Sequence, residues 1–401
     1  MTTREPTVRP ARMGFLDRYL AVWILLAMAL GLLLGRLIPG MGDALGAMEV
    51  DGISIPIALG LLVMMYPPLA KVRYDKAGEI TSDRRLMAVS LLLNWVVGPA
   101  FMFTLACIFL PDQPELRTGL IIVGLARCIA MVLIWNDLAC GDREATAVLV
   151  AVNSVFQILM FGVLGWFYLQ VLPSWLGLPT VAADFSFWDI VKSVLVFLGI
   201  PLAAGVLSRL AGERLKGREW YEEKFIPRIS PFALIGLLYT IVLLFSLQGH
   251  QITSNPWAVV RLAAPLLIYF VGMFFIALAV SRAAGMNYAQ SASVSFTAAG
   301  NNFELAIAVA IGTFGAFSGQ ALAGTIGPLI EVPVLVGLVY AMLWLGPRLF
   351  PGDPSVPTAR DARDAGDAGN RAAAGSAAAG SAPAGPTPAR PATPRKETHR
   401  S

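Results

Sequence analysis

The chain has 401 residues, of which 56% are hydrophobic and only 14% are charged, and its formal net charge is +4. So little charge could not cover the surface of a soluble protein of this size, which excludes a soluble globular domain and favours an integral membrane protein. The basic residues lie between apolar segments, so the positive charge does not indicate nucleic acid as a partner. Three scattered cysteines exclude a disulfide framework, and we predict no cofactor and no bound metal.

Ten apolar segments follow in chain order, each close to the roughly 20 residues that a helix needs to cross a bilayer. They span residues 19–37, 53–70, 86–110, 117–138, 145–170, 188–207, 229–247, 257–280, 288–314 and 320–345. The first is long and is followed by no small-residue cleavage site, so we interpret it as a span rather than a cleaved signal. The sequence therefore predicts an all-α membrane protein with about ten transmembrane helices.

Basic residues gather in alternate connections: before residue 19, between residues 71 and 85, and between residues 209 and 228. Because Lys and Arg are enriched in cytoplasmic loops, we predict a multi-pass protein of the cytoplasmic membrane with both termini inside. Residues 1–18 then form a cytoplasmic N-terminal segment. Residues 351–401, rich in Ala, Gly, Pro and Ser, are expected to form a disordered cytoplasmic tail, with a tether to lipid or a partner as the alternative.

The two halves of the chain share short motifs at matching positions. Gly124-x-x-x-Cys128 in the fourth span has its counterpart in Gly300-x-x-x-Glu304 in the ninth. Five spans per half make the second half enter the membrane from the opposite side. This is the inverted repeat of many secondary transporters, which bind substrate near the midplane on broken helices. The predicted repeats are residues 19–170 and 188–346.

The sequence Gly300-Asn301-Asn302 favours an irregular backbone inside the ninth span. Glycine permits unusual backbone conformations, and asparagine side chains compete with the helix for hydrogen bonds. Unwound backbone survives in a membrane only where protein or water satisfies its polar groups, and it can then bind a ligand. We predict broken fourth and ninth helices; the alternative is a packing glycine with two asparagines that join neighbouring helices.

Cys128 is the most distinctive single residue. A free cysteine in an apolar segment is usually a packing residue, but the neighbouring Arg127 makes thiolate more available if the two side chains meet. Thiolate is a soft ligand that prefers thiophilic centres. Cys140 is ~18 Å further along a helix, and Cys107 falls near the outer end of the third span, so a cage of three sulfurs is not expected. One thiol suits a carrier that must release its cargo.

Three charged residues, Arg127, Glu304 and Glu331, fall well inside predicted spans, where each needs a partner or water. One arginine can balance one glutamate. The second carboxyl group is then free to bind and release a proton, so we assign proton coupling to Glu304 and Glu331. The alternative is a structural Arg–Glu network that holds helices together.

Asn94, Asn153 and Trp135 are predicted to support the site. Asparagines at membrane depth often join helices, and tryptophan is common at a membrane face, where we expect Trp135 to lie.

With these residues in view, the chain resembles the arsenical-resistance-3 family of arsenite efflux permeases over roughly residues 16–350. Residues 124–142 are similar to the fourth-helix motif of that family, and residues 298–308 and 327–333 to its ninth- and tenth-helix motifs. The resemblance implies ten helices, efflux of arsenite and often antimonite, proton coupling, and membership of the wider bile acid/arsenite/riboflavin transporter group. It carries the essential thiol of the family over to Cys128 and its essential acid to Glu304.

The residues and the resemblance together predict a proton-coupled arsenite efflux carrier in the lipid bilayer, and not an enzyme. Asn301, Asn302 and Glu304 are expected to hydrogen-bond the arsenite hydroxyls while Cys128 contacts arsenic. The nearer alternative is a sodium-coupled organic-anion symporter on the same fold. An intramembrane enzyme with Cys128 as nucleophile needs a base, and no histidine occurs in any predicted span. The sequence leaves the oligomeric state open.

Overall fold

The computed structural model describes residues 20–38, 40, 47–50, 53–72, 83–129, 131–178, 187–254, 256–315 and 318–357. These residues are almost entirely helical, and their only strands are the two-residue pair β1 (Glu49–Val50) and β2 (Ile53–Ser54), which is antiparallel. The predicted N-terminal segment, residues 1–18, and residues 358–401 of the predicted tail lie outside the described residues.

Ten helical units follow one another in the part of the chain that the structure describes, which confirms the predicted all-helical membrane fold. The first five are α2 (Leu20–Leu37), α4 (Ile55–Lys71), α6–η2–α7 (Arg84–Leu92, Leu93–Val97, Gly98–Phe109), α8 and α9 (Pro114–Leu125, Met131–Leu138), and α10–η3–α11 (Arg143–Trp166, Phe167–Val171, Leu172–Trp175). The other five are α12–η4–α13 (Phe187–Val194, Leu195–Gly199, Ile200–Lys216), α14–η5–α15 (Arg218–Trp220, Tyr221–Phe225, Ile226–Ser254), α16 (Pro256–Ala283), α17 and α18 (Tyr288–Ala299, Phe303–Phe314), and α19 (Gly319–Leu349).

Helix length and hydropathy fit a membrane protein. In the described part of the chain, six continuous helical runs are long and apolar enough to cross a bilayer, and three shorter helices are also apolar. Side-chain caps begin several helices of the bundle: Asp142 accepts the Ala145 N–H at α10, and Asn287 forms a capping box with Gln290 at α17. Such caps satisfy the free N–H groups at the start of a helix and so fix where each span begins.

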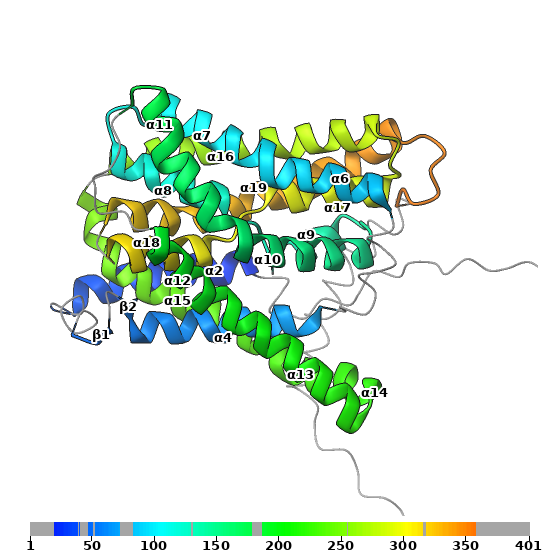
Figure 1. Cartoon of the computed structure of the whole chain (residues 1–401), viewed down its shortest axis with the longest axis horizontal. Coiled ribbons are helices and arrows are strands. Elements are labelled where there is room, and N and C mark those ends of the chain that lie inside the picture. The colour runs from blue at the N-terminus through cyan, green and yellow to red at the C-terminus, as the bar shows by residue number, and fades with distance from the viewer. Residues whose placement is uncertain are drawn as a thin grey trace, which may run out of the picture.

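The helices form two layers (Figure 1). In one layer α15 packs against α2 and α4, and α13 packs against α4. The other layer contains α7, α8, α10, α16, α17, α18 and α19. The layers meet where α12 contacts α10 and α18, where α4 contacts α18, and where α19 contacts α2 and α15. The two broken units therefore lie in one layer, and α18 faces the other.

Helix packing recurs between the two halves of the chain. The contact of α4 with α13 is repeated by that of α15 with α2. The contact of α7 with α8 is repeated by that of α16 with α17, and the contact of α8 with α19 by that of α17 with α10. Two copies of one five-helix unit related by a twofold axis produce this pattern. It supports the predicted inverted repeat, whose limits at residues 19–170 and 188–346 stay a prediction.

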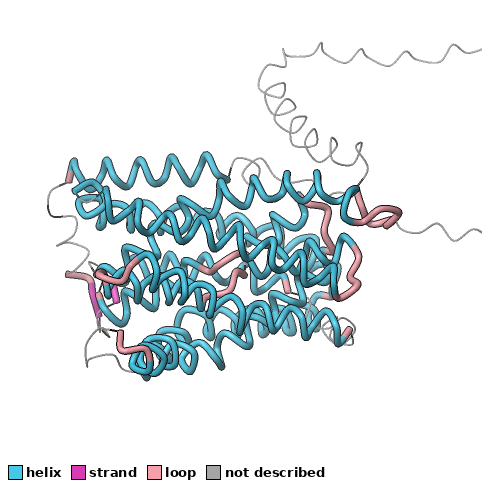
Figure 2. Tube along the Cα trace, turned by 90° about the horizontal axis from the view of Figure 1, so that it is seen from above, coloured by secondary structure: helices cyan, strands magenta, loops and turns pink. Residues whose placement is uncertain are grey.

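The fourth and ninth units are interrupted, as predicted. The fourth ends its first helix at Leu125 and resumes at Met131, and the ninth stops at Ala299 and resumes at Phe303. Figure 2 shows loop segments inside the bundle, surrounded by helices. Two half-helices thus end, and two begin, in the interior of the protein.

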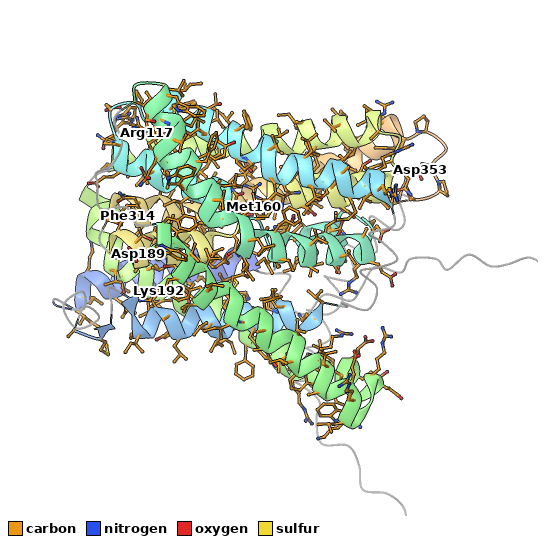
Figure 3. The ribbon with its side chains drawn as sticks, in the orientation of Figure 1. Arg117, Met160, Asp189, Lys192, Phe314 and Asp353 are labelled. Carbon is orange, nitrogen blue, oxygen red and sulfur yellow. The ribbon has the colours of Figure 1, made fainter. Side chains whose placement is uncertain are left out.

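The chain that follows α19 differs from the predicted tail over residues 351–357. These residues turn back onto the start of α17, where the Asp353 carboxylate accepts the Tyr288 N–H at 2.7 Å and the Ser355 N–H at 2.8 Å. Although partial burial raises the pKa of Asp353, its hydrogen bonds with Ser355 and Tyr288 outweigh that effect and lower the pKa. The composition of the tail could not reveal this local cap, which depends on two side chains (Asp353 is labelled in Figure 3).

Candidate functional site where two broken helices meet

The two unwound segments lie side by side and antiparallel. Arg127 and Asn301 form a β-bridge, in which the Cys128 N–H donates to the Gly300 carbonyl at 3.4 Å and the Asn302 N–H donates to the Ala126 carbonyl at 3.0 Å. Each segment therefore satisfies part of the backbone of the other, which is what unwound chain at membrane depth requires.

The bridge sets the register between the two halves. Arg127 pairs with Asn301, so equivalent residues are 174 positions apart and Cys128 corresponds to Asn302. The predicted match of Cys128 with Glu304 is therefore wrong by two residues. The shared glycines misled the alignment, because Gly124 is the last residue but one of α8, whereas Gly300 already lies in the break.

Cys128 and Asn302 occupy equivalent places at the start of the second half-helices. The Asn302 side chain accepts the Leu305 N–H at 3.0 Å and so caps α18, and the buried Cys128 thiol interacts with the backbone N–H groups of Met131 and Val132 at the start of α9. The Cys128 thiol thus lies at the N-terminal end of α9, as the Asn302 side chain lies at that of α18.

The Arg127 side chain lies at the C-terminal ends of the two first half-helices, α8 and α17. Its guanidinium, which is completely buried, donates to the carbonyl of Gly124 near the end of α8 and to that of Ala298 near the end of α17 at 3.4 Å, and also to the Tyr269 hydroxyl at 2.9 Å. A cation at the C-terminal ends of two helices is stabilised by their dipoles. The expected Arg–Glu pair is wrong, because the described residues offer Arg127 these carbonyls instead of a carboxylate.

The two acids approach the thiol from different elements. Glu331, on α19, is buried, and its carboxylate accepts the Asn301 N–H at 3.3 Å. Glu304 lies in the first turn of α18 and is half-buried. The two carboxyl groups are close enough to interact electrostatically with each other and with the Cys128 thiol. The structure thus brings Cys128, Asn301, Asn302, Glu304 and Glu331 together.

The predicted supporting residues lie mostly in helix contacts. Asn153 accepts the Trp95 indole N–H at 3.1 Å and so joins α10 to η2, and Asn94 donates to the Ser90 carbonyl one turn earlier in its own helix. Trp135 is 2% exposed, so other parts of the protein cover its side chain, and it is not the exposed interface anchor that its position suggested. A tryptophan near the end of an apolar segment looks the same in sequence whether the next helix covers it or not.

Two further residues, which the sequence analysis did not predict, contact the crossing, the place where the two unwound segments meet. Tyr269 of α16 binds Arg127 through its hydroxyl, and Gln157 of α10 accepts the Arg127 backbone N–H through its carboxamide oxygen. Gln157 follows Asn153 by one helical turn in an apolar span, and this pair of amide side chains could have indicated a polar contact there. Tyr269 offered none, because tyrosine is common in such spans.

The chain is 78% identical to the arsenical-resistance protein Acr3 of Corynebacterium glutamicum over 359 residues, which are 89% of this chain and 97% of that protein. The chain belongs to the Acr3 family. It is also 34% identical to the Acr3 protein of Alkaliphilus metalliredigens, over 81% of this chain and 92% of the relative. An uncharacterized transporter of Synechocystis is 35% identical over 86% and 93% of the two chains.

The model of the Sodium Bile acid symporter family matches residues 58–255. Both likenesses describe transporters, so this member of the Acr3 family is a multi-pass membrane transporter and not an enzyme. Its remaining cysteines, Cys107 near the end of α7 and Cys140 just beyond α9, form no disulfide bond in the described part of the chain. The described residues hold no group of three histidine, cysteine or acidic side chains that could bind a metal ion.

The close approach of the two segments makes Gly300 sensitive to any added atom. A Cβ there would lie 3.0 Å from the Cys128 Cβ and 3.4 Å from Glu331 Oε1. We expect Gly300→Ala to lower the free energy of unfolding in detergent by about 1–3 kcal/mol, the usual cost of overpacking. Gly337→Ala, in α19, is the matched control, because an added Cβ there would point into open space. Equal thermal midpoints for both variants would contradict the tight crossing.

Proposed function

We propose that this member of the Acr3 family exports arsenite, and antimonite by the same chemistry, across the cytoplasmic membrane in exchange for protons. Both termini are cytoplasmic in this proposal, as the basic connections indicate. Cys128, Asn301, Asn302 and Glu304 bind the substrate, and Glu304 and Glu331 carry the exchanged proton. The names of two relatives, both arsenical-resistance proteins, support the substrate class.

The observation that carries the proposal is one buried thiol at the start of α9, beside the start of α18 and within electrostatic range of two carboxyl groups. Arsenite is an uncharged trihydroxide whose arsenic centre bonds sulfur, and thiolate suits such thiophilic centres. The amides of Asn301 and Asn302 and the Glu304 carboxyl group are suited to its hydroxyls. An organic anion would have no use for the thiol.

The chemistry assigns separate tasks to the thiol and the acids. When the S–As bond forms, one arsenite hydroxyl and the thiol proton leave together as water, and the reverse reaction releases the substrate. The exchanged proton is then carried by a carboxyl group, Glu304 or Glu331. Glu304 is the half-buried one, which favours it as the group that meets water from either side.

Alternating access requires the site to open to one side at a time. The two broken helices cross within one layer, and α18 contacts α4 and α12 of the other layer. In the proposed cycle, rocking of the layers exposes Glu304 first to the cytoplasm, where arsenite binding displaces its proton. It then opens to the outside, where protonation expels the cargo.

Everted membrane vesicles test the proposal directly. When their interior is made acidic, vesicles that contain the protein should accumulate arsenite without a requirement for sodium. Added arsenite should in turn dissipate the pH gradient. Vesicles without the protein are the control. Sodium-dependent uptake of a bile-acid-like anion, with no response to arsenite, would instead establish the organic-anion symporter that the matched family model suggests.

A further inference from the structure

Gln157 is a buried side chain whose role the proposed transport cycle leaves open. It lies in α10, is completely buried, and its carboxamide oxygen accepts the backbone N–H of Arg127, the residue that directly precedes Cys128. Met160, one turn further along α10, lies midway along the bundle (Figure 3). Gln157 therefore reaches the unwound part of the fourth unit at the depth of the crossing.

The same contact exists in the other half of the protein. Glu331 of α19 accepts the backbone N–H of Asn301, and Asn301 is the partner of Arg127 in the bridge. Gln157 and Glu331 are 174 residues apart, as are Arg127 and Asn301. Each repeat thus uses one side chain of its fifth helix to hold the central N–H of its own broken helix.

These two N–H groups have a special need for an acceptor. The bridge satisfies the N–H groups of Cys128 and Asn302, which flank the central pair, and leaves those of Arg127 and Asn301 to be satisfied from outside it. A buried N–H without an acceptor costs free energy, so the unwound chain would shift to find one. Cys128, next in sequence, would move with it.

We propose that Gln157 is a positioning residue, which holds the Arg127 N–H and thereby fixes where the Cys128 thiol meets its substrate. Glu331 does the same for Asn301 and adds a titratable charge, whereas Gln157 supplies an acceptor without a third carboxylate beside the thiol. The inference rests on the proposed function for the transport consequence. Its geometric part, the placement of the thiol, is independent of what the substrate is.

The experiment uses the full-length protein with Cys107→Ala and Cys140→Ala, so that Cys128 is the remaining thiol. Gln157→Leu removes the acceptor and Gln157→Glu keeps one. Ser154→Ala removes a buried hydroxyl of the same helix, which donates to the Val150 carbonyl one turn earlier. Two quantities are measured in everted vesicles: the KM and kcat of arsenite uptake, and the rate at which a membrane-permeant maleimide alkylates Cys128.

We expect Gln157→Leu to raise KM about tenfold with a smaller change in kcat, and to change the alkylation rate severalfold, as loss of an acceptor for a buried donor predicts. Gln157→Glu should bring the alkylation rate back close to that of the parent, and Ser154→Ala should leave both quantities unchanged. Should Gln157→Leu not accumulate in the membrane, Gln157→Asn, one methylene too short to reach, takes its place with the same expectation.

Parent-like KM and alkylation rate in Gln157→Leu, or equal defects in Gln157→Leu and Gln157→Glu, would overturn the proposal. Cys128→Ser in the same assay distinguishes the role of the thiol in transport from the positioning role of Gln157. Normal arsenite uptake by that variant would refute the proposed role of the thiol in transport, whereas the alkylation rates would still decide whether Gln157 positions Cys128.

Discussion

Cys128→Ser should abolish arsenite transport and the arsenite resistance of a sensitive strain. Serine is close to cysteine in size and can keep the contact with the N–H groups at the start of α9, but its oxygen does not bond arsenic as sulfur does. We expect a loss greater than the roughly 10–100-fold that follows removal of an outer-shell partner at a metal site, because here the ligand itself is removed. Uptake in everted vesicles and growth on arsenite measure it.

The other two cysteines provide matched controls for this change. Cys107 and Cys140 lie at helix ends away from the two unwound segments, so Cys107→Ser and Cys140→Ser should transport at close to the wild-type rate. If all three variants behave alike, arsenic does not use the thiol at the crossing. Full activity of Cys128→Ser, with normal amounts in the membrane, would contradict the site assignment.

Glu304→Gln should uncouple the carrier from the pH gradient. Glutamine has the size of glutamate and can still hydrogen-bond a hydroxyl, but it cannot bind and release a proton. We expect gradient-driven accumulation of arsenite to fall by about 10- to 100-fold, as for loss of a charged hydrogen-bonding group. Exchange of labelled for unlabelled arsenite, which needs no net proton movement, should persist.

Glu115→Gln is the control for that experiment. Glu115 also lies in the first turn of a helix, α8, but at the far end of that helix from the break. It should retain both accumulation and exchange. Glu304→Gln that still dissipates the pH gradient on addition of arsenite would assign the exchanged proton to Glu331 alone, and a wild-type response of both Glu304→Gln and Glu331→Gln would end the proton-coupling proposal.

The sequence predicted the helical units and both breaks well, for physical reasons. Apolar segments of bilayer length form helices because the membrane leaves their backbone no other partner. The Gly300-Asn301-Asn302 break could be predicted because its residues carry their conformational preference locally. Asn302 indeed caps the helix that follows it, and its side chain accepts the Leu305 N–H.

The site residues also appear in the sequence as charges and a thiol at membrane depth, but their partners do not. The acceptors of a buried arginine depend on how four half-helix ends meet in space. Arg127 donates to carbonyls near the ends of α8 and α17. The proposed role of Gln157 rests on the register of 174 residues, which the bridge between Arg127 and Asn301 reveals. A shift of two residues in the alignment of the halves conceals it.

The choice of carbonyls as partners for Arg127 has an electrical consequence for the proposed cycle. A guanidinium held in a salt bridge would have to surrender its carboxylate whenever that acid took up a proton, and each turnover would then break and remake an ion pair in a medium of low polarity. Here the positive charge is fixed to the scaffold of half-helices and stays balanced by their dipoles. In the proposed cycle, proton binding and release at the carboxyl groups therefore break no ion pair with Arg127, and the energy barrier between the loaded and the empty carrier contains no such step.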